Sequence, residues 1–305
     1  MPPPGWINAA HLHSVKILGT IITEWNDGAE IWKELLKNDD NIALFVSKLT
    51  QLCVYFGFDG WLLNIENKVD ETVGNIRKLV TLVDRLTKSM HEALPNSLVI
   101  WYDSVTLPGG QLIWQNELNS KNQEFFDCCD GIFLNYNWDE EGLTRSKTNA
   151  GDRYHDVFVG VDVFGRGCYG GGGFNTYKAL EVARKHDLSA AIFAHGWVYE
   201  KFGAKNFLPL EYCFWNRVLP YLYLHGPSEL PFKTSFCQGN GLKKYQFGKE
   251  VSSTPWYNLS LQQHQPSSGS CFHLAVLPSE NQVVKYEKDN HGCMEMYMDD
   301  AFCGG

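Results

Sequence analysis

The segment DGWLLNIE at positions 59–66 carries an amide and a carboxyl side chain two positions apart. Side chains two positions apart on a β-strand point to the same face, so Asn64 and Glu66 face one side and Ile65 faces the other. A carboxyl group beside an amide suits a proton transfer next to a substrate group that must be held in place. The segment therefore predicts an acid–base site.

Short apolar segments rich in Val, Ile, Leu, Phe and Trp recur along the chain and predict buried strands. They lie at positions 15–25, 58–66, 98–104, 131–138, 157–164 and 190–198, with a seventh at 230–236. Apolar residues at helical spacing predict helices between them, at positions 42–56, 73–94 and 175–186. Strand followed by helix, repeated, predicts a parallel sheet. No glycine-rich phosphate turn follows an early strand, which favours a β/α barrel over a doubly wound sheet.

Polar and aromatic residues gather where four of these strands end. Catalytic groups of β/α barrels lie at the C-terminal ends of strands, so this distribution predicts an active site at the barrel mouth. The clusters are Glu24 with Trp25, Asn64 with Glu66, Tyr102 with Asp103, and positions 135–138.

Several polar residues near the strand ends also fit purely structural roles. Asp103 is able to cap the turn that follows it, and Tyr102 is able to serve as a core tyrosine. Asp162 fits either the pocket lining or a bond to the loop of Arg166. We expect His195, on an apolar strand, to be a core histidine with its polar atoms satisfied.

Composition narrows the classes of partner. The net charge of the 305 residues is −9 and no long basic stretch occurs, so we expect no nucleic-acid partner. No apolar run approaches the roughly 20 residues of a membrane span. Nine cysteines, two of them adjacent, argue against a disulfide framework, and three prolines follow Met1 where a secretory signal would be charged and then apolar. We therefore expect a cytosolic protein. Cysteine and histidine spacings typical of zinc are absent, and we expect neither metal nor cofactor.

The segment at 59–66 resembles the chitinase signature, with Asn64 in place of its second aspartate. With asparagine at this position, the segment resembles that of the cytosolic endo-β-N-acetylglucosaminidases of glycoside hydrolase family 85. Five further segments carry the same resemblance, which covers most of the chain from Pro2 to about Tyr257. They are PPPGWINAAH at 2–11, LGTIITEWN at 18–26, WYDS at 101–104, LNYNW at 134–138 and VGVDVFGRG at 159–167.

The resemblance implies a barrel enzyme that cuts the GlcNAc-β1,4-GlcNAc core of N-linked glycans and leaves one N-acetylglucosamine (GlcNAc) on the protein or peptide. It implies retention of configuration through attack by the substrate's own acetamido group, an exception to the two-carboxylate rule. Glu66 is then the proton donor and later the base, Asn64 holds the acetamide, and Tyr102 hydrogen-bonds near it. We expect substrate binding by Trp25, Asn135, Trp138, Asp162 and Trp197.

Family 85 barrels normally begin with a strand before the PPPGW segment, at which this chain starts. We therefore expect a (β/α)8 TIM-like barrel lacking its first strand at 1–248 and a short, irregular, partly disordered extension at 249–305. The expected partners are N-glycans, glycopeptides, misfolded glycoproteins and free oligosaccharides. Two alternatives stay open: a non-catalytic N-glycan-binding protein or inactive truncated isoform, and a chitinase-like hydrolase.

Overall fold

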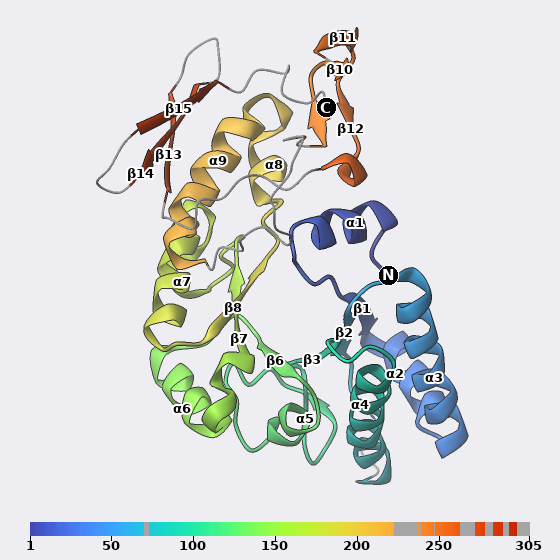
Figure 1. The fold of residues 1–305 in the computed structure, drawn as a ribbon. Coiled ribbons are helices and arrows are strands. Elements are labelled where there is room, and N and C mark those ends of the chain that lie inside the picture. The colour runs from blue at the N-terminus through green and yellow to red at the C-terminus, as the bar shows by residue number, and fades with distance from the viewer. Residues whose placement is uncertain are drawn as a thin grey trace. The chain divides into compact units, whose positions relative to one another are not determined.

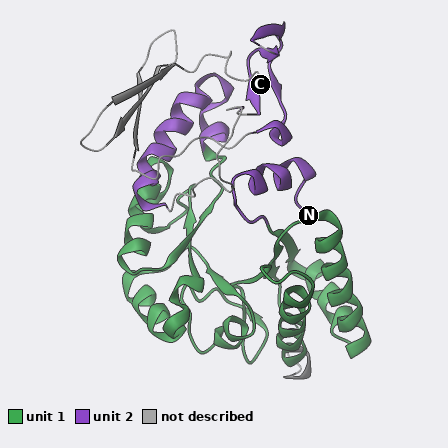
Figure 2. Ribbon diagram, in the orientation of Figure 1, with its two compact units in different colours: residues 1, 18–197 green, residues 2–17, 198–305 purple. Residues whose placement is uncertain are grey.

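The computed structural model describes residues 1–69, 73–222, 237, 239–246, 248–262, 272–277, 283–288 and 293–297. These form two compact units (Figure 2). The first comprises residues 1 and 18–197, and the second comprises residues 2–17 and 198–305. The catalytic candidates all lie in the first unit.

A six-stranded parallel sheet forms the centre of the first unit (Figure 1). Its order is β1 (Gly19–Glu24), β2 (Gly60–Glu66), β3 (Leu98–Tyr102), β6 (Gly131–Leu134), β7 (Val157–Asp162) and β8 (Ser189–Phe193). The first five strands each fall within a predicted segment, and β8 begins one residue before the sixth, so the α/β class with a parallel sheet is confirmed. Among the described residues, β1 and β8 stand at the two ends of this order. The seventh predicted strand, 230–236, lies outside the described residues.

Helices follow the strands in sequence and cover the sheet. α4 packs against β3, and α7 packs against β7 and β8. The bounds of the helices in this unit are α2 (Trp25–Leu35), α3 (Asp39–Phe56), α4 (Val73–Ala93), α5 (Gln123–Asp127), α6 (Glu140–Ala150) and α7 (Thr176–Lys185). A two-stranded hairpin of β4 (Val105–Thr106) and β5 (Gln111–Leu112) follows β3.

Helix α3 shows how local sequence sets these boundaries. The Asn38 side chain accepts a hydrogen bond from the Asn41 backbone N–H at 2.8 Å, which satisfies a donor that the first turn leaves open. At the other end Gly57 takes a left-handed conformation with φ of 72°, where a residue without Cβ meets no steric penalty. The predicted helix at 42–56 thus extends three residues further toward its N-terminus.

Strand β2 separates a helix-facing side from an interior side. Trp61, Leu63 and Ile65 are buried, and the Trp61 indole N–H donates to the Leu49 backbone oxygen of α3 at 3.3 Å. Asn64 and Glu66 alternate with them and are only half-buried. The alternation predicted for this segment is confirmed, and it leaves the amide and the carboxyl group on the interior face.

The second unit contains short elements. They are α1 (Pro4–Leu12), α8 (Trp197–Phe202, except its first residue), α9 (Phe207–Val218), β9 (Asn240–Gly241), β10 (Lys244–Gln246), β11 (Lys249–Ser252), β12 (Trp256–Tyr257), β13 (Phe272–Leu277), β14 (Val283–Lys288) and β15 (Cys293–Tyr297). Strand β15 falls within 249–305, where we expected an irregular, partly disordered extension. None of the described helices is long and apolar enough to cross a membrane.

Candidate active site

Asn64 and Glu66 lie at the C-terminal end of β2 and contact one another. The Asn64 Nδ2 atom donates to Glu66 Oε2 over 3.4 Å. The Asn64 Oδ1 atom is buried and accepts no hydrogen bond within the described structure. A buried acceptor without a donor is unfavourable, so this oxygen is suited to a donor that a ligand brings.

Tyr102, the last residue of β3, lies beside this pair. It is 5% exposed, and its hydroxyl donates to Asn135 Oδ1 at 2.9 Å. Burial raises the pKa of Tyr102, and the neighbouring Tyr136, Glu66 and Asp103 raise it further. The phenol therefore stays neutral at physiological pH and acts as a hydrogen-bonding group.

Tyr136, which we placed in the predicted cluster at 135–138 without a role of its own, lies beside Tyr102. Burial raises its pKa, and the charges of Asp162 and Glu66 add to this effect. Its ring centroid lies 6.5 Å from that of Tyr102. A Cβ on Gly160 would clash with the Leu134 backbone oxygen and lie 3.0 Å from the Tyr136 ring, so the glycine makes room for this tyrosine.

Asp103 holds a loop that lies at least 12 positions further along the chain, whereas the sequence suggested a cap on the turn directly after it. Its side chain is 1% exposed and accepts the backbone N–H groups of Gln115 and Asn116 and the Asn122 amide, at 2.7 to 3.2 Å. Burial raises the pKa of this carboxyl group to about 6, against the lowering effect of these hydrogen bonds. Asp103 therefore fixes the loop after β5 to the end of β3.

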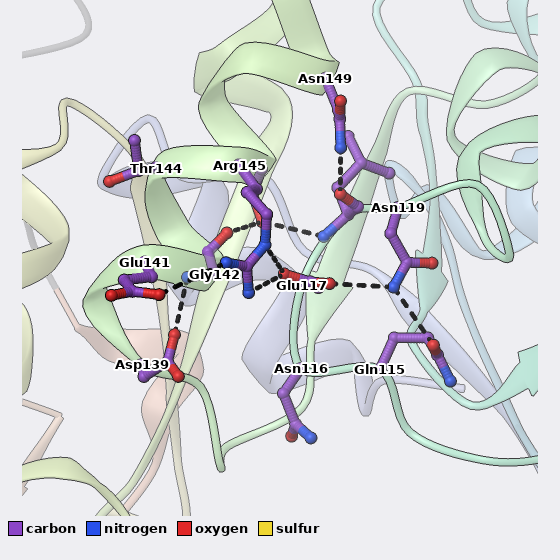
Figure 3. A network of polar contacts seen from close by, with 12 residues as sticks. Gln115, Asn116, Glu117, Asn119, Asp139, Glu141, Gly142, Thr144, Arg145 and Asn149 are labelled. Carbon is purple, nitrogen blue, oxygen red and sulfur yellow. Dashed lines mark hydrogen bonds and ion pairs between the residues drawn. The ribbon is translucent and has the colours of Figure 1, made fainter.

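That loop, residues 113–119, is also fixed to α6. Glu117 lies at the centre of a polar network in which it accepts from Arg145 at 2.7 Å and from Asn119 at 3.2 Å (Figure 3). Asn116 points away from this network (Figure 3). Its Oδ1 atom accepts from Asn135 Nδ2 at 2.8 Å, which connects the loop to the hydrogen-bond partner of Tyr102.

Asp162, at the end of β7, is buried and fully engaged by its own loop. Its Oδ2 atom accepts from Arg166 Nε at 2.8 Å, and its Oδ1 atom accepts from the Phe164 backbone N–H at 3.0 Å. Of the two roles weighed for Asp162, the bond to the Arg166 loop is the one that the structure shows. Its charge also acts on Tyr136, as described above, so it borders the tyrosine cluster.

Trp25 begins α2 directly after Glu24, which is the register partner of Glu66. Its side chain is 72% exposed, and its backbone φ is 52°. A bulky residue in the left-handed region carries strain, and such residues concentrate at functional sites. An exposed indole beside the carboxyl ends of β1 and β2 suits stacking against a sugar face.

The two other predicted tryptophans are buried. Trp138 is 5% exposed, donates its indole N–H to the Gly160 backbone oxygen at 2.7 Å, and stacks on the Tyr169 ring at 5.2 Å. Trp197 is also buried and meets Phe174 edge to face. Their substrate-binding roles stay predictions.

His195 differs from its predicted role. It is exposed on the turn that follows β8, so our expectation of a core histidine is wrong. The strand ends at Phe193, five residues before the end of the predicted segment at 190–198. Among the side chains that the structure describes, no group of three or more His, Cys, Asp or Glu residues could hold a metal ion.

Comparison with known proteins places these residues in a family. The model of glycosyl hydrolase family 85 matches residues 1–244. The cytosolic endo-beta-N-acetylglucosaminidase of Gallus gallus is 49% identical over 268 residues, and that of Homo sapiens is 48% identical over 271 residues. These alignments cover 87% and 88% of this chain and 36% of each relative. The chain thus spans little more than a third of the length of these relatives.

A solved structure supports the fold. The glycoside hydrolase domain of Endo-D from Streptococcus pneumoniae R6 superposes with a TM-score of 0.69 at 20% identity, over 93% of this chain and 51% of that chain. Together with the parallel sheet and its alternating helices, this likeness shows the TIM-like α/β fold. Because the family model matches most of the chain, the chain belongs to glycosyl hydrolase family 85.

Proposed function

We propose that this chain is an endo-β-N-acetylglucosaminidase. It hydrolyses the GlcNAc-β1,4-GlcNAc core of N-linked glycans, releases the oligosaccharide and leaves one GlcNAc on the protein or peptide. The observation that carries the proposal is the buried, unpartnered Asn64 Oδ1 atom beside the Glu66 carboxyl group. It offers one acceptor for an acetamide N–H next to one proton donor, which is what cleavage beside a GlcNAc residue requires.

The proposed reaction uses the substrate as its own nucleophile. The acetamido carbonyl oxygen attacks the anomeric carbon, forming an oxazoline-like ring, while the Glu66 carboxyl group protonates the departing glycosidic oxygen. Glu66 then takes a proton from water, which opens the ring with net retention. Asn64 holds the acetamide N–H, and its dipole stabilises the positive charge that develops on the acetamide as the ring closes.

The two buried aspartates at the strand ends do not supply a second carboxylate nucleophile. A retaining glycosidase with a carboxylate nucleophile needs two carboxyl groups about 5–5.5 Å apart. Asp103 and Asp162 are the buried carboxyl groups at the strand ends, and both are committed to N–H donors. Neither is free to attack a sugar.

Residues around Asn64 and Glu66 are proposed to bind the substrate. Tyr102 hydrogen-bonds near the reacting acetamide, and Asn135 supports it from behind. Trp25 stacks on a sugar ring, while Trp138, Asp162 and Trp197 shape the surface around it. The proposed substrates are N-glycans on glycopeptides and misfolded glycoproteins, and free oligosaccharides. We propose the cytosol as its location, because the names of the relatives include the word cytosolic.

A panel of substrates tests this proposal. The purified chain is incubated with a high-mannose glycopeptide and, separately, with chitin oligomers, and products are identified by mass spectrometry. Cleavage of the glycopeptide alone supports the proposal, whereas cleavage of the chitin oligomers alone indicates a chitinase-like hydrolase. Binding of the glycopeptide by calorimetry without turnover, in a chain shown to be folded, indicates a binding protein instead.

A further inference from the structure

We propose that Asn116 is a positioning residue that fixes the hydrogen bond of Tyr102 through Asn135. This inference rests on the proposed function, in which Tyr102 contacts the reacting acetamide. Asn116 lies 14 positions after Tyr102 in sequence, on a loop without regular structure. Its role follows from three features: a fixed backbone, a fixed side-chain orientation and a continuous path to Tyr102.

The backbone of Asn116 is held in an uncommon conformation. Its φ is 57°, in the left-handed region that asparagine tolerates better than most residues. Its N–H donates to Asp103 Oδ2 at 2.7 Å, and Asp103 directly follows Tyr102 at the end of β3. On one side of Asn116, the Gln115 backbone N–H donates to Asp103 at 3.0 Å. On the other side, Glu117 is bound by Arg145 (Figure 3). The side chain therefore projects from a loop anchored on both sides.

The orientation of the Asn116 amide is fixed by a group that can only donate. The Asn137 backbone N–H lies 3.0 Å from the amide, so the atom that it meets must be an oxygen. The same Asn116 oxygen lies 2.8 Å from the Asn135 amide, so Asn135 must present its Nδ2 atom to it. This deduction does not depend on how amide oxygen and nitrogen atoms are distinguished.

The direction of the Tyr102 bond follows. With Nδ2 turned toward Asn116, Asn135 turns Oδ1 toward Tyr102, 2.9 Å from its hydroxyl oxygen. In this bond the tyrosine must therefore donate its hydrogen to Asn135, and its oxygen can accept, with the Tyr136 hydroxyl as a hydrogen-bonding neighbour. Turning that hydrogen toward a substrate would leave the Asn135 oxygen buried without a donor. Asn116 thus decides which atom of Asn135 faces the Tyr102 hydroxyl, and so where the phenol directs its hydrogen.

Two substitutions of Asn116 separate the effect of its backbone conformation from the effect of its side-chain oxygen. Asn116→Gly keeps the left-handed backbone and removes the acceptor, whereas Asn116→Asp keeps an acceptor oxygen for both N–H groups. We expect N116G to lower kcat on the glycopeptide about 10- to 100-fold, because Tyr102 loses its fixed position, with a smaller change in KM. N116D should recover most of that loss.

The Tyr102→Phe background tests whether Asn116 acts through Tyr102. The phenol hydrogen bond is already absent in Y102F, so adding N116G should lower kcat by less than twofold. If Asn116 had a purely structural role, N116G would lower kcat by the same factor in the unsubstituted chain and in Y102F. An N116G chain with unchanged kcat, or losses that multiply in the double variant, would overturn the proposal. If N116G does not fold by circular dichroism, Asn116→Ser, whose side chain is too short to reach Asn135, replaces it.

Failure of the proposed function is distinguishable from failure of this inference. If the unsubstituted chain is folded but cleaves no glycopeptide, the proposed activity fails. The same four chains are then compared by urea unfolding, in which N116G and Y102F should destabilise non-additively because they remove one connected set of hydrogen bonds. Additive effects on unfolding would then overturn the inference.

Discussion

The side-chain amide of Asn64 donates to Oε2 of Glu66 over 3.4 Å, and both side chains lie on the interior face of β2. In this pairing the amide nitrogen faces Glu66, so the amide oxygen points away from the carboxyl group. That oxygen is the buried acceptor without a partner. The pairing therefore presents an acceptor and a proton-transfer group side by side.

Replacing Asn64 by alanine should remove the acceptor and keep the strand. We expect kcat on a glycopeptide to fall about 10²- to 10³-fold, the size of effect seen when one group that stabilises developing charge is deleted. The measurement is initial rate against substrate concentration, with circular dichroism to show that the variant folds. A folded N64A chain with an unchanged rate would contradict the assigned role.

Trp25 should matter for binding and not for folding. Trp25→Asn removes an exposed ring and puts a residue that tolerates positive φ into the left-handed position. Loss of aromatic contact worth about 0.5–1.5 kcal/mol predicts a KM roughly 2- to 12-fold higher. Unfolding by urea should show equal or greater stability. A lower stability together with an unchanged KM would remove Trp25 from the substrate surface.

Gly160 should be intolerant of any side chain. A Cβ there would clash with the Leu134 backbone oxygen and press on the rings of Phe133 and Tyr136. We expect Gly160→Ala to lower the unfolding free energy by about 1–3 kcal/mol, the range for overpacking. Gly109→Ala is the matched control, because its Cβ would meet only ordinary contact with Gln111 at 3.7 Å. Equal effects of the two substitutions would exclude this explanation.

The buried Asp103 predicts a pH dependence of stability. Its pKa rises from 3.8 to about 6 on folding, so the folded chain binds more protons than the unfolded chain between these values. The contribution of Asp103 to stability is thus fully present below pH 3.8 and is lost as the pH rises through about 6. Its upper limit is about 3 kcal/mol, at 1.36 kcal/mol per pKa unit.

Urea unfolding at pH 4.5 and pH 6.5 measures this contribution. The unfolding free energy of the unsubstituted chain, relative to that of Asp103→Asn, should be smaller at pH 6.5 than at pH 4.5. The comparison with D103N cancels the titration of other groups. A relative free energy that rises with pH would show that the hydrogen bonds to Asp103 outweigh its desolvation.

The sequence predicts best where side chains follow a regular period. Asn64 and Glu66 share a strand, and the alternation of two residues was enough to predict their common face. Asp103 follows a strand and was weighed as a cap for the next turn, but its donors, Gln115, Asn116 and Asn122, lie on a loop further along the chain. The parallel sheet followed from repeated apolar segments, because buried strands and their covering helices have distinct periods.

The rest of the site depends on contacts that no period encodes. Strand β6 ends at Leu134, so Asn135 and Tyr136 lie beyond the range in which alternation predicts direction. Asn116 lies on an irregular loop, and its only local signal is the tolerance of asparagine for positive φ. The hydrogen bond from Trp138 to Gly160 joins residues 22 positions apart. It holds the Trp138 ring in a buried position, although we expected this ring to bind substrate.

The most direct test of the proposed chemistry compares the 305-residue chain with its Glu66→Gln variant on one high-mannose glycopeptide. Mass spectrometry should find peptide bearing a single GlcNAc from the unsubstituted chain, and about 10²- to 10⁴-fold slower formation from E66Q, which keeps the shape of Glu66 and cannot transfer its proton. Equal rates from the two chains, or no product from an unsubstituted chain shown to be folded, would contradict the assignment of Glu66 as the acid–base residue of this chain.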